Sequence, residues 1–128
     1  MNIQDFIEKH GDKLKMEIVS TDVIDQDWKY FHWTIDLSFD GRAMTVDYYG
    51  GKKALEPELE ELLLNLSSDC TWLRDYKLEE FLIECGYCDS ADKLREGFKA
   101  YEKMQENDKE LRELFGDEYE TFLTLEED

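Results

Sequence analysis

An Asp-Gly pair at positions 40 and 41 constrains the fold of this chain more than any other feature of its sequence. Every second residue from Trp33 to Phe39 is apolar, and residues 44–49 again have the composition of a strand. Alternation with a period of two is typical of a strand that buries one face. Because a two-residue turn needs positive φ, which glycine adopts without steric cost, the pair predicts an antiparallel hairpin.

The residues before the hairpin complete a predicted sheet. Residues 3–10 predict a short helix that Gly11 ends, and Leu14, Met16 and Ile18, followed by Val23 and Ile24, predict a first strand. We expect three antiparallel strands, centred near residues 14–19, 29–39 and 43–49. A run of strands followed by a run of helices is typical of the α+β class.

From Pro57 onward the apolar residues recur at helical spacing. Pro57 is placed to begin a helix, whose apolar stripe ends near Asp69. A second helix is expected at Leu78–Cys85, and Asp89 or Ser90 should cap a long third one. That long helix is expected to bury one broad face, formed by Leu94, Phe98, Tyr101, Met104, Leu111 and Leu114.

The length of 128 residues suits a single acidic α+β domain with its own core. Residues 1–50 would form the first helix and the sheet. Residues 57–123 would form a helical half of three to four helices, in which Gly116 separates the long helix from a short amphipathic one. Residues 124–128 would form an acidic tail.

Acidic residues dominate the composition: 33 Asp and Glu stand against 15 Lys and Arg, a formal net charge of −18. Residues 1–50 hold ten acidic and five basic residues, and residues 51–128 hold 23 and ten. Nucleic acids and anionic membranes both require a basic surface, so the charge argues against both as direct partners. It favours a basic protein partner.

Targeting signals are not evident in the sequence. The longest apolar runs, such as Leu62–Leu64, are too short to span a bilayer. The first residues lack the basic and apolar regions of a signal peptide. We therefore expect a cytoplasmic location.

Cys85 and Cys88 have the spacing of redox and zinc sites. We expect Cys85 to close a helix, where the helix dipole has the wrong sign to activate a thiol. A zinc site would also need Cys70 together with His10 or His32. His32 lies within a predicted strand, where a hydrogen-bonded histidine is the simpler interpretation. We therefore favour buried or partly buried thiols without chemistry, and expect no metal or cofactor.

Catalytic motifs are likewise not evident. Glu79, Glu80 and Glu84, or Glu58 with Glu61, could be drawn as acid–base or metal sites, but nothing distinguishes them from solvated helix faces. The sequence has no glycine-rich phosphate loop, nucleophile elbow or zincin helix. A metal-dependent enzyme is therefore the weakest of three functional hypotheses, and we predict a protein that is not an enzyme.

The long predicted helix carries carboxylates at steps of three or four residues. Side chains so spaced share one face, roughly 5–6 Å apart at the Cβ, comparable to phosphates along a nucleic-acid strand. A solvated face is one interpretation, and Lys99, Lys103 and Lys109 interrupt the row. The functional interpretation is a surface that imitates phosphates and occupies the nucleic-acid channel of another protein. Its residues would be Glu102, Glu106, Glu110, Glu113, Asp117, Glu118 and Glu120.

Several short motifs follow one another in a recognisable order. Gly41 to Thr45 forms a Gly-Arg-Ala-Met-Thr strand start, and a Pro-led helix follows it. Phe81 to Ser90 then precedes Tyr101, and Leu111 to Asp117 closes with Leu-Phe-Gly-Asp. In these motifs, over residues 33 to about 123, the chain resembles a group of small, acidic, uncharacterised phage and prophage proteins. The resemblance implies a mobile-element origin, and with it a location in the cytoplasm of a bacterial host.

Small acidic phage proteins often resemble inhibitors of host defence, and this analogy selects the leading hypothesis. It is a non-catalytic, DNA-mimicking anti-CRISPR protein that binds a Cas effector or another nucleic-acid-binding defence enzyme. The alternative is a phage accessory or adaptor protein that binds a protein partner through an apolar or aromatic surface. Candidates for that surface are Trp28, Tyr30, Tyr48 and Tyr49.

Overall fold

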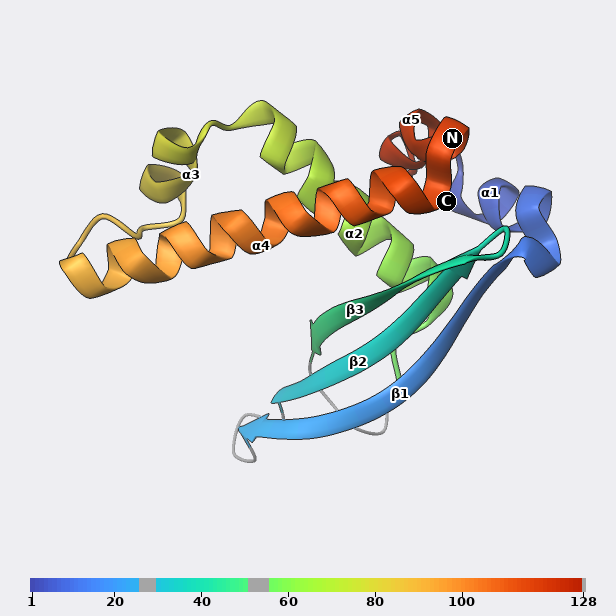
Figure 1. Cartoon of the computed structure of the whole chain (residues 1–128), viewed down its shortest axis with the longest axis horizontal. Coiled ribbons are helices and arrows are strands. Elements are labelled where there is room, and N and C mark those ends of the chain that lie inside the picture. Colours follow the sequence, from blue (N-terminus) through green and yellow to red (C-terminus); the bar gives the residue numbers. More distant parts are fainter. Residues whose placement is uncertain (26–29, 51–55, 128) are drawn as a thin grey trace.

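The computed structural model describes residues 1–25, 30–50 and 56–127, and its elements confirm the predicted α+β class (Figure 1). The first helix has the predicted bounds, and the long helix begins after Ser90, whose side chain accepts a hydrogen bond from the Lys93 backbone N–H. In chain order the elements are α1 (Ile3–His10), a 3-10 turn (Gly11–Lys13), β1 (Leu14–Asp25), β2 (Tyr30–Phe39), β3 (Arg42–Gly50), α2 (Leu59–Asp75), α3 (Leu78–Glu84), α4 (Ala91–Phe115), a second 3-10 turn (Gly116–Glu118) and α5 (Tyr119–Leu123).

The strands form one antiparallel sheet in the order β1-β2-β3. Asp40 has φ 49° and Gly41 has φ 81°, while Phe39 pairs with Arg42. Positive φ at both central residues is the geometry of a tight hairpin turn. The predicted hairpin is therefore confirmed.

β1 continues past residues 14–19 to Asp25 and includes Val23 and Ile24, as predicted. Its pairing with β2 shifts register between Ile18 and Ser20. Such a bulge inserts a residue into one strand, so the side chains beyond it change faces. The apolar alternation therefore broke in the sequence at a point where the strand itself continued.

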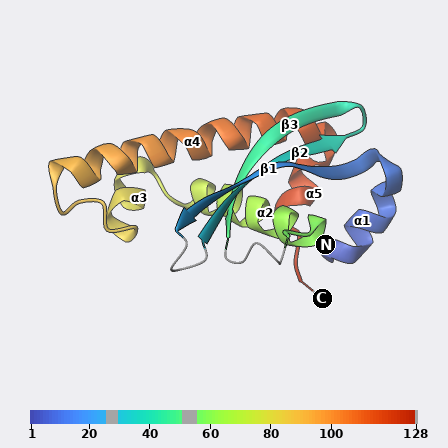
Figure 2. The same ribbon diagram turned by 90° about the horizontal axis from the view of Figure 1, so that it is seen from below.

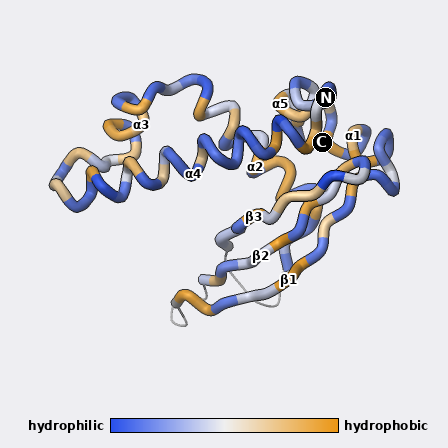
Figure 3. The backbone as a smooth tube through the Cα atoms, in the orientation of Figure 1, coloured by the Kyte–Doolittle hydropathy of each residue, from blue (hydrophilic) through white to orange (hydrophobic). Residues whose placement is uncertain are grey.

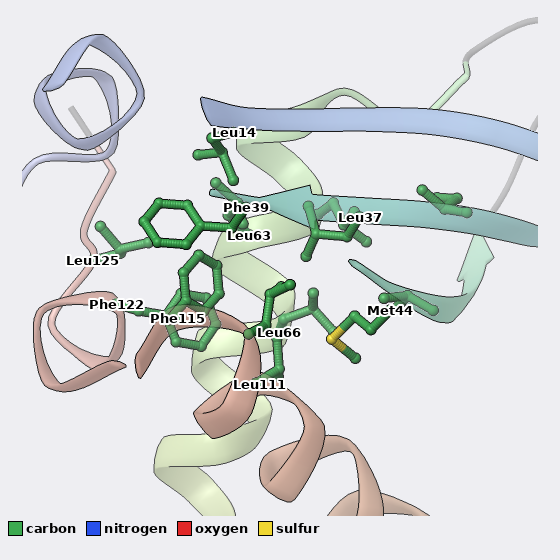
Figure 4. Close-up of a cluster of buried hydrophobic side chains, with 14 of the residues drawn as sticks. Leu14, Leu37, Phe39, Met44, Leu63, Leu66, Leu111, Phe115, Phe122 and Leu125 are labelled. Atoms are coloured by element: carbon green, nitrogen blue, oxygen red, sulfur yellow. The ribbon is translucent and has the colours of Figure 1, made fainter. Parts of the chain in front are cut away.

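One face of the sheet packs on α2 and the C-terminal half of α4, and α1 and α5 close one end of this core (Figure 2). Side chains from β2, β3, α2, α4 and α5 meet there, and the rings of Phe115 and Phe122 stack with centroids 4.6 Å apart (Figure 4). Most of α4 outside this contact is hydrophilic (Figure 3). The opposite face of the sheet, called the outer face below, is covered by none of the described helices.

α2 differs from the prediction at both ends. It begins after Pro57, at Leu59, and runs through Asp69 to Asp75. The hydroxyl of Thr71 donates to the Ser67 carbonyl oxygen at 2.8 Å, so a polar residue inside the helix is hydrogen-bonded to the helix itself. Hydroxyl residues here continue the helix instead of ending it, which corrects the sequence-based boundary.

α3 and the N-terminal half of α4 extend away from the sheet and pack on each other (Figure 1). The ring of Phe81 lies 5.4 Å from that of Trp72 and 5.3 Å from that of Tyr101. The prediction that Phe98 is buried was wrong, since 44% of its surface is exposed. Gly97 faces α3, and the next residue of a helix points about 100° away.

No helix in the described ranges combines the length and apolar composition that a bilayer-spanning segment needs.

Candidate partner-binding surface

Four glutamates of α4 form a row on its exposed side, opposite the residues that the helix buries. Their steps of three or four residues keep successive carboxylates on one face. Within residues 1–25, 30–50 and 56–127, none of the four side chains makes an ion pair or a hydrogen bond. The acidic row, as we call it, consists of Glu102, Glu106, Glu110 and Glu113.

The other three predicted site residues lie beyond the end of α4 and differ from one another. Asp117 is exposed and unpaired within the described part of the chain. Glu118 is half-buried, 3.3 Å from the Lys9 ammonium and 3.6 Å from the ring of His10. Glu120 lies 3.0 Å from the Arg74 guanidinium. Glu118 and Glu120 thus connect elements of the fold, whereas Asp117 extends the acidic surface.

The lysines that interrupt the row in the sequence are placed differently in the structure. Lys99 and Lys109 are exposed and have no ion pair among the described residues. Lys103 instead reaches the sheet, where its Nζ lies 3.0 Å from Asp47 Oδ2. One positive charge is therefore directed away from the acidic row.

A groove of about 680 Å³ runs between β3 and α4, and two glutamates of the acidic row, Glu110 and Glu113, line it. Met44 and Leu114 contribute an apolar part of the wall. The Arg42 guanidinium donates to the backbone carbonyl oxygen of Glu113 at 3.1 Å, so it leaves the carboxylate of that residue free. The groove could hold the aliphatic stem of a basic side chain beside these two carboxylates.

The three aromatic candidates that the structure describes do not form one surface. Trp28 lies outside the described residues. Tyr48 is half-buried, and its hydroxyl donates to Glu61 at 2.6 Å; burial, and then this carboxylate, raise its pKa to about 12. Tyr30 and Tyr49 are exposed, and their rings stack on the outer face with centroids 6.2 Å apart.

His32 is hydrogen-bonded within the sheet, as predicted: its Nε2 lies 2.7 Å from Asp47 Oδ1. The ring of His32 also stacks on Tyr49, with centroids 4.8 Å apart. Hydrogen bonds from His32 and then from Lys103 hold the pKa of Asp47 below its usual range. The contacts among His32, Asp47, Tyr49 and Lys103 were not predicted. The sequence indicates only that the members on the strands alternate with buried residues and therefore share the exposed face of the sheet.

A second polar group that the sequence did not reveal joins α4 to α5. The Tyr119 hydroxyl donates to Asp108, which also accepts from Arg112 at 2.9 Å. The Arg112 guanidinium lies 4.7 Å from the centre of the Tyr119 ring. Tyr119 is buried, so this group fixes the end of the acidic helix against the core.

The cysteines are far from uniform in their surroundings. Cys85 caps the end of α3, as predicted, but Cys85 and Cys88 are both exposed, which corrects the expectation of buried or partly buried thiols at these positions. Partial shielding of its sulfur from water, and then the charge of the neighbouring Glu84, raise the pKa of Cys85, so its thiol is not activated. Cys70 is buried, and burial and then Asp108 raise its pKa to about 12.

Side chains suited to metal binding are dispersed in the described ranges. No three His, Cys, Asp or Glu side chains there are grouped so that they could hold a metal ion. Glu79, Glu80 and Glu84 are exposed on α3. The chain matches no protein-family model, no curated protein and no solved structure.

Proposed function

We propose that this chain is a non-catalytic inhibitor, encoded by a phage, that binds the basic nucleic-acid channel of a host defence nuclease. A Cas effector is the target that we favour, which makes the chain an anti-CRISPR protein. The observation that supports this proposal is the acidic row: four exposed carboxylates on one helix face, unpaired among the described residues, in a chain of net charge −18. Asp117 continues the same surface.

The shape of α4 suits insertion into a channel. A helix of 25 residues is about 37 Å long, and the acidic row spans about 16 Å of it. The row lies on a rigid element whose far side is held by the core, so binding would require little ordering of the carboxylates. A surface whose net charge is negative accelerates association with a basic partner and suppresses binding to acidic ones.

Competition with nucleic acid tests the proposal. Fluorescence anisotropy of labelled target DNA would be followed with a panel of guide-loaded Cas effectors as the chain is added. We expect the chain to displace DNA at stoichiometric concentrations from at least one effector. Because exposed charges are screened over about 10 Å at 0.1 M salt, we expect displacement to weaken steeply as ionic strength rises.

A charge-reversal variant links the effect to the surface. Replacing Glu106, Glu110, Glu113 and Asp117 by lysine is expected to abolish the competition and leave the circular dichroism spectrum unchanged. Single replacements should be weak, because an exposed ion pair contributes about 0–1 kcal/mol. The matched control reverses four other exposed acids with no ion pair in the described part of the chain: Glu84, Glu96, Glu126 and Glu127. Equal loss in both variants would show that net charge, not the row, controls binding.

An accessory or adaptor protein that binds through aromatic side chains is the second candidate. The observation that favours it is the exposed, stacked pair of Tyr30 and Tyr49. Binding through such a surface should respond weakly to salt, and should survive charge reversal on α4. Retained target binding by the folded four-lysine variant would therefore favour this candidate.

A further inference from the structure

Three rings lie nearly parallel on the outer face of the sheet. The Tyr49 ring stacks on His32 at an interplanar angle of 20° and on Tyr30 at 17°. The two tyrosines are 47% and 41% exposed, so their rings are open to a ligand. We call Tyr30, His32 and Tyr49 the aromatic platform. Aromatic rings on a strand pair present a flat surface that attracts cations through its electron-rich faces.

The protein already places a cation at this platform. Lys103 extends from α4, and its ammonium lies 5.7 Å from the centre of the Tyr49 ring and 3.0 Å from Asp47 Oδ2. The same carboxylate, through Oδ1, lies 2.7 Å from His32 Nε2. An aromatic face beside an ionised carboxylate is thus a cation site, and Lys103 occupies part of it in the free chain.

Further carboxylates lie on the outer face, and one of them is next to the platform. Asp22, on β1, is 71% exposed at its side chain and lies 3.6 Å from His32 Nδ1. Glu17 and Asp36 are paired directly across β1 and β2, and both are exposed. Like charges directly opposite on neighbouring strands destabilise a sheet. The charge of the outer face is therefore complementary to a basic ligand.

We propose that the aromatic platform, with Asp47 and Asp22 at its sides, binds an arginine side chain of a basic partner protein. Arginine fits better than lysine for two reasons. Its planar guanidinium stacks on an aromatic ring, and its forked donors pair with a carboxylate through two hydrogen bonds. A lysine ammonium, as Lys103 shows, makes only a point contact with each group.

This arginine site is separate from the acidic row and does not depend on it. It is built from β1, β2 and β3, whereas the row lies on α4. Lys103 is the one side chain of α4 that reaches Asp47 in the described part of the chain. Variants of the row and of the platform can therefore be separated experimentally.

Two peptides of equal length and charge, hexa-arginine and hexalysine, provide the test. Each would be titrated into the chain by calorimetry at moderate salt. We expect hexa-arginine to bind more tightly, and the preference to fall roughly two- to five-fold when Tyr49→Leu removes the ring. Tyr49→Phe, which keeps the ring, should retain the preference. Asp47→Asn should reduce it as well.

Removing the resident cation gives a stricter test. Lys103→Ala is expected to tighten hexa-arginine binding, because the ligand no longer competes with an internal ammonium. Lys99→Ala is the control, since Lys99 lies on the same helix, carries the same charge and has no ion pair among the described residues. The gain in hexa-arginine affinity must be larger in Lys103→Ala than in Lys99→Ala. Both variants remove one positive charge from α4, so only the difference between them reports on binding at the platform.

The outcomes distinguish this site from the proposed function. Equal binding of the two peptides, or a preference that Tyr49→Leu leaves unchanged, would overturn the arginine site. The four-lysine variant of α4 should weaken both peptides by similar factors and keep the arginine preference. If that variant instead removes the preference, the arginine is bound by the acidic row and not by the platform.

Discussion

Gly97→Ala is expected to destabilise the protein, although alanine is the better helix former. On propensity alone, alanine in the middle of α4 would stabilise the helix by about 1 kcal/mol. A Cβ at this position would lie 2.3 Å from Leu82 Cδ2 and 2.8 Å from Tyr87 Cβ. The leucine methyl can rotate away, but Tyr87 Cβ is attached directly to the backbone. α3 and the turn after it must therefore move.

The two effects have opposite signs, and packing should prevail. Forcing additional atoms into a packed interface costs about 1–3 kcal/mol. After subtraction of the propensity gain, and with one of the close contacts fixed to the backbone, we expect a net loss of about 1–2 kcal/mol. The loss should be local, because Phe81 and Leu82 pack outside the main core cluster.

Urea denaturation followed by circular dichroism would measure the change, and hydrogen exchange would locate it. Amides of α3 should exchange faster in Gly97→Ala, while those of β2 should not change. Lys99→Gly and Lys99→Ala, at an exposed site two residues away, give the propensity difference in the same helix. A Gly97→Ala protein that is more stable by the full propensity difference would refute the close packing of α3 on α4.

Three further changes test other parts of the structure. Burial lowers the pKa of His10, so the unfolded chain takes up a proton at a higher pH than the folded protein, and the free energy of unfolding should fall as pH drops below about 6.5. The ring of His10 packs between Phe6 and Phe39. His10→Phe removes the titrating group, so it should flatten the dependence of the unfolding free energy on pH, measured by urea titrations at several pH values. Tyr119→Phe should cost about 1–2 kcal/mol in the same assay, because Asp108 keeps Arg112 but loses a buried hydroxyl donor. Replacing Cys85 and Cys88 together by serine should change stability by less than about 0.5 kcal/mol and leave partner binding intact, because both are exposed; loss of binding by the folded variant would show a role for the thiols.

Much of the fold could be predicted because it is encoded locally. The turn at Asp40 and Gly41, the cap at Ser90 and the helix end at Gly116 each depend on the backbone preferences of one or two residues. The bulge in β1 and the end of α2 could not be predicted in this way. The bulge interrupts the apolar alternation within β1, and the polar residues from Ser67 to Asp69 resemble a helix end although the Ser67 hydroxyl is bonded to the Leu64 carbonyl oxygen of the same helix.

The part of the candidate site that depends on local sequence was predictable, and the part that depends on tertiary contacts was not. Spacing alone placed the acidic row on one face of α4, since helical periodicity is a local property. Spacing could not separate Glu118 and Glu120 from the row. Their partners, Lys9 and Arg74, are 109 and 46 residues away in the sequence, so only the tertiary structure brings them together.

Ion pairing also changes what the net charge of −18 means for a partner. Six described lysines and arginines are paired with carboxylates of the same chain: Lys9, Arg74, Lys93, Arg95, Lys103 and Arg112. Each of these pairs is nearly neutral at a distance, because its two charges lie within 3.3 Å of each other. The field outside the molecule is therefore set by the unpaired groups, and on α4 these are Glu96, the four glutamates of the acidic row, Lys99 and Lys109. Because Lys103 is held by Asp47, the row is more negative than its sequence suggests, and the same contact places a cation on the aromatic platform.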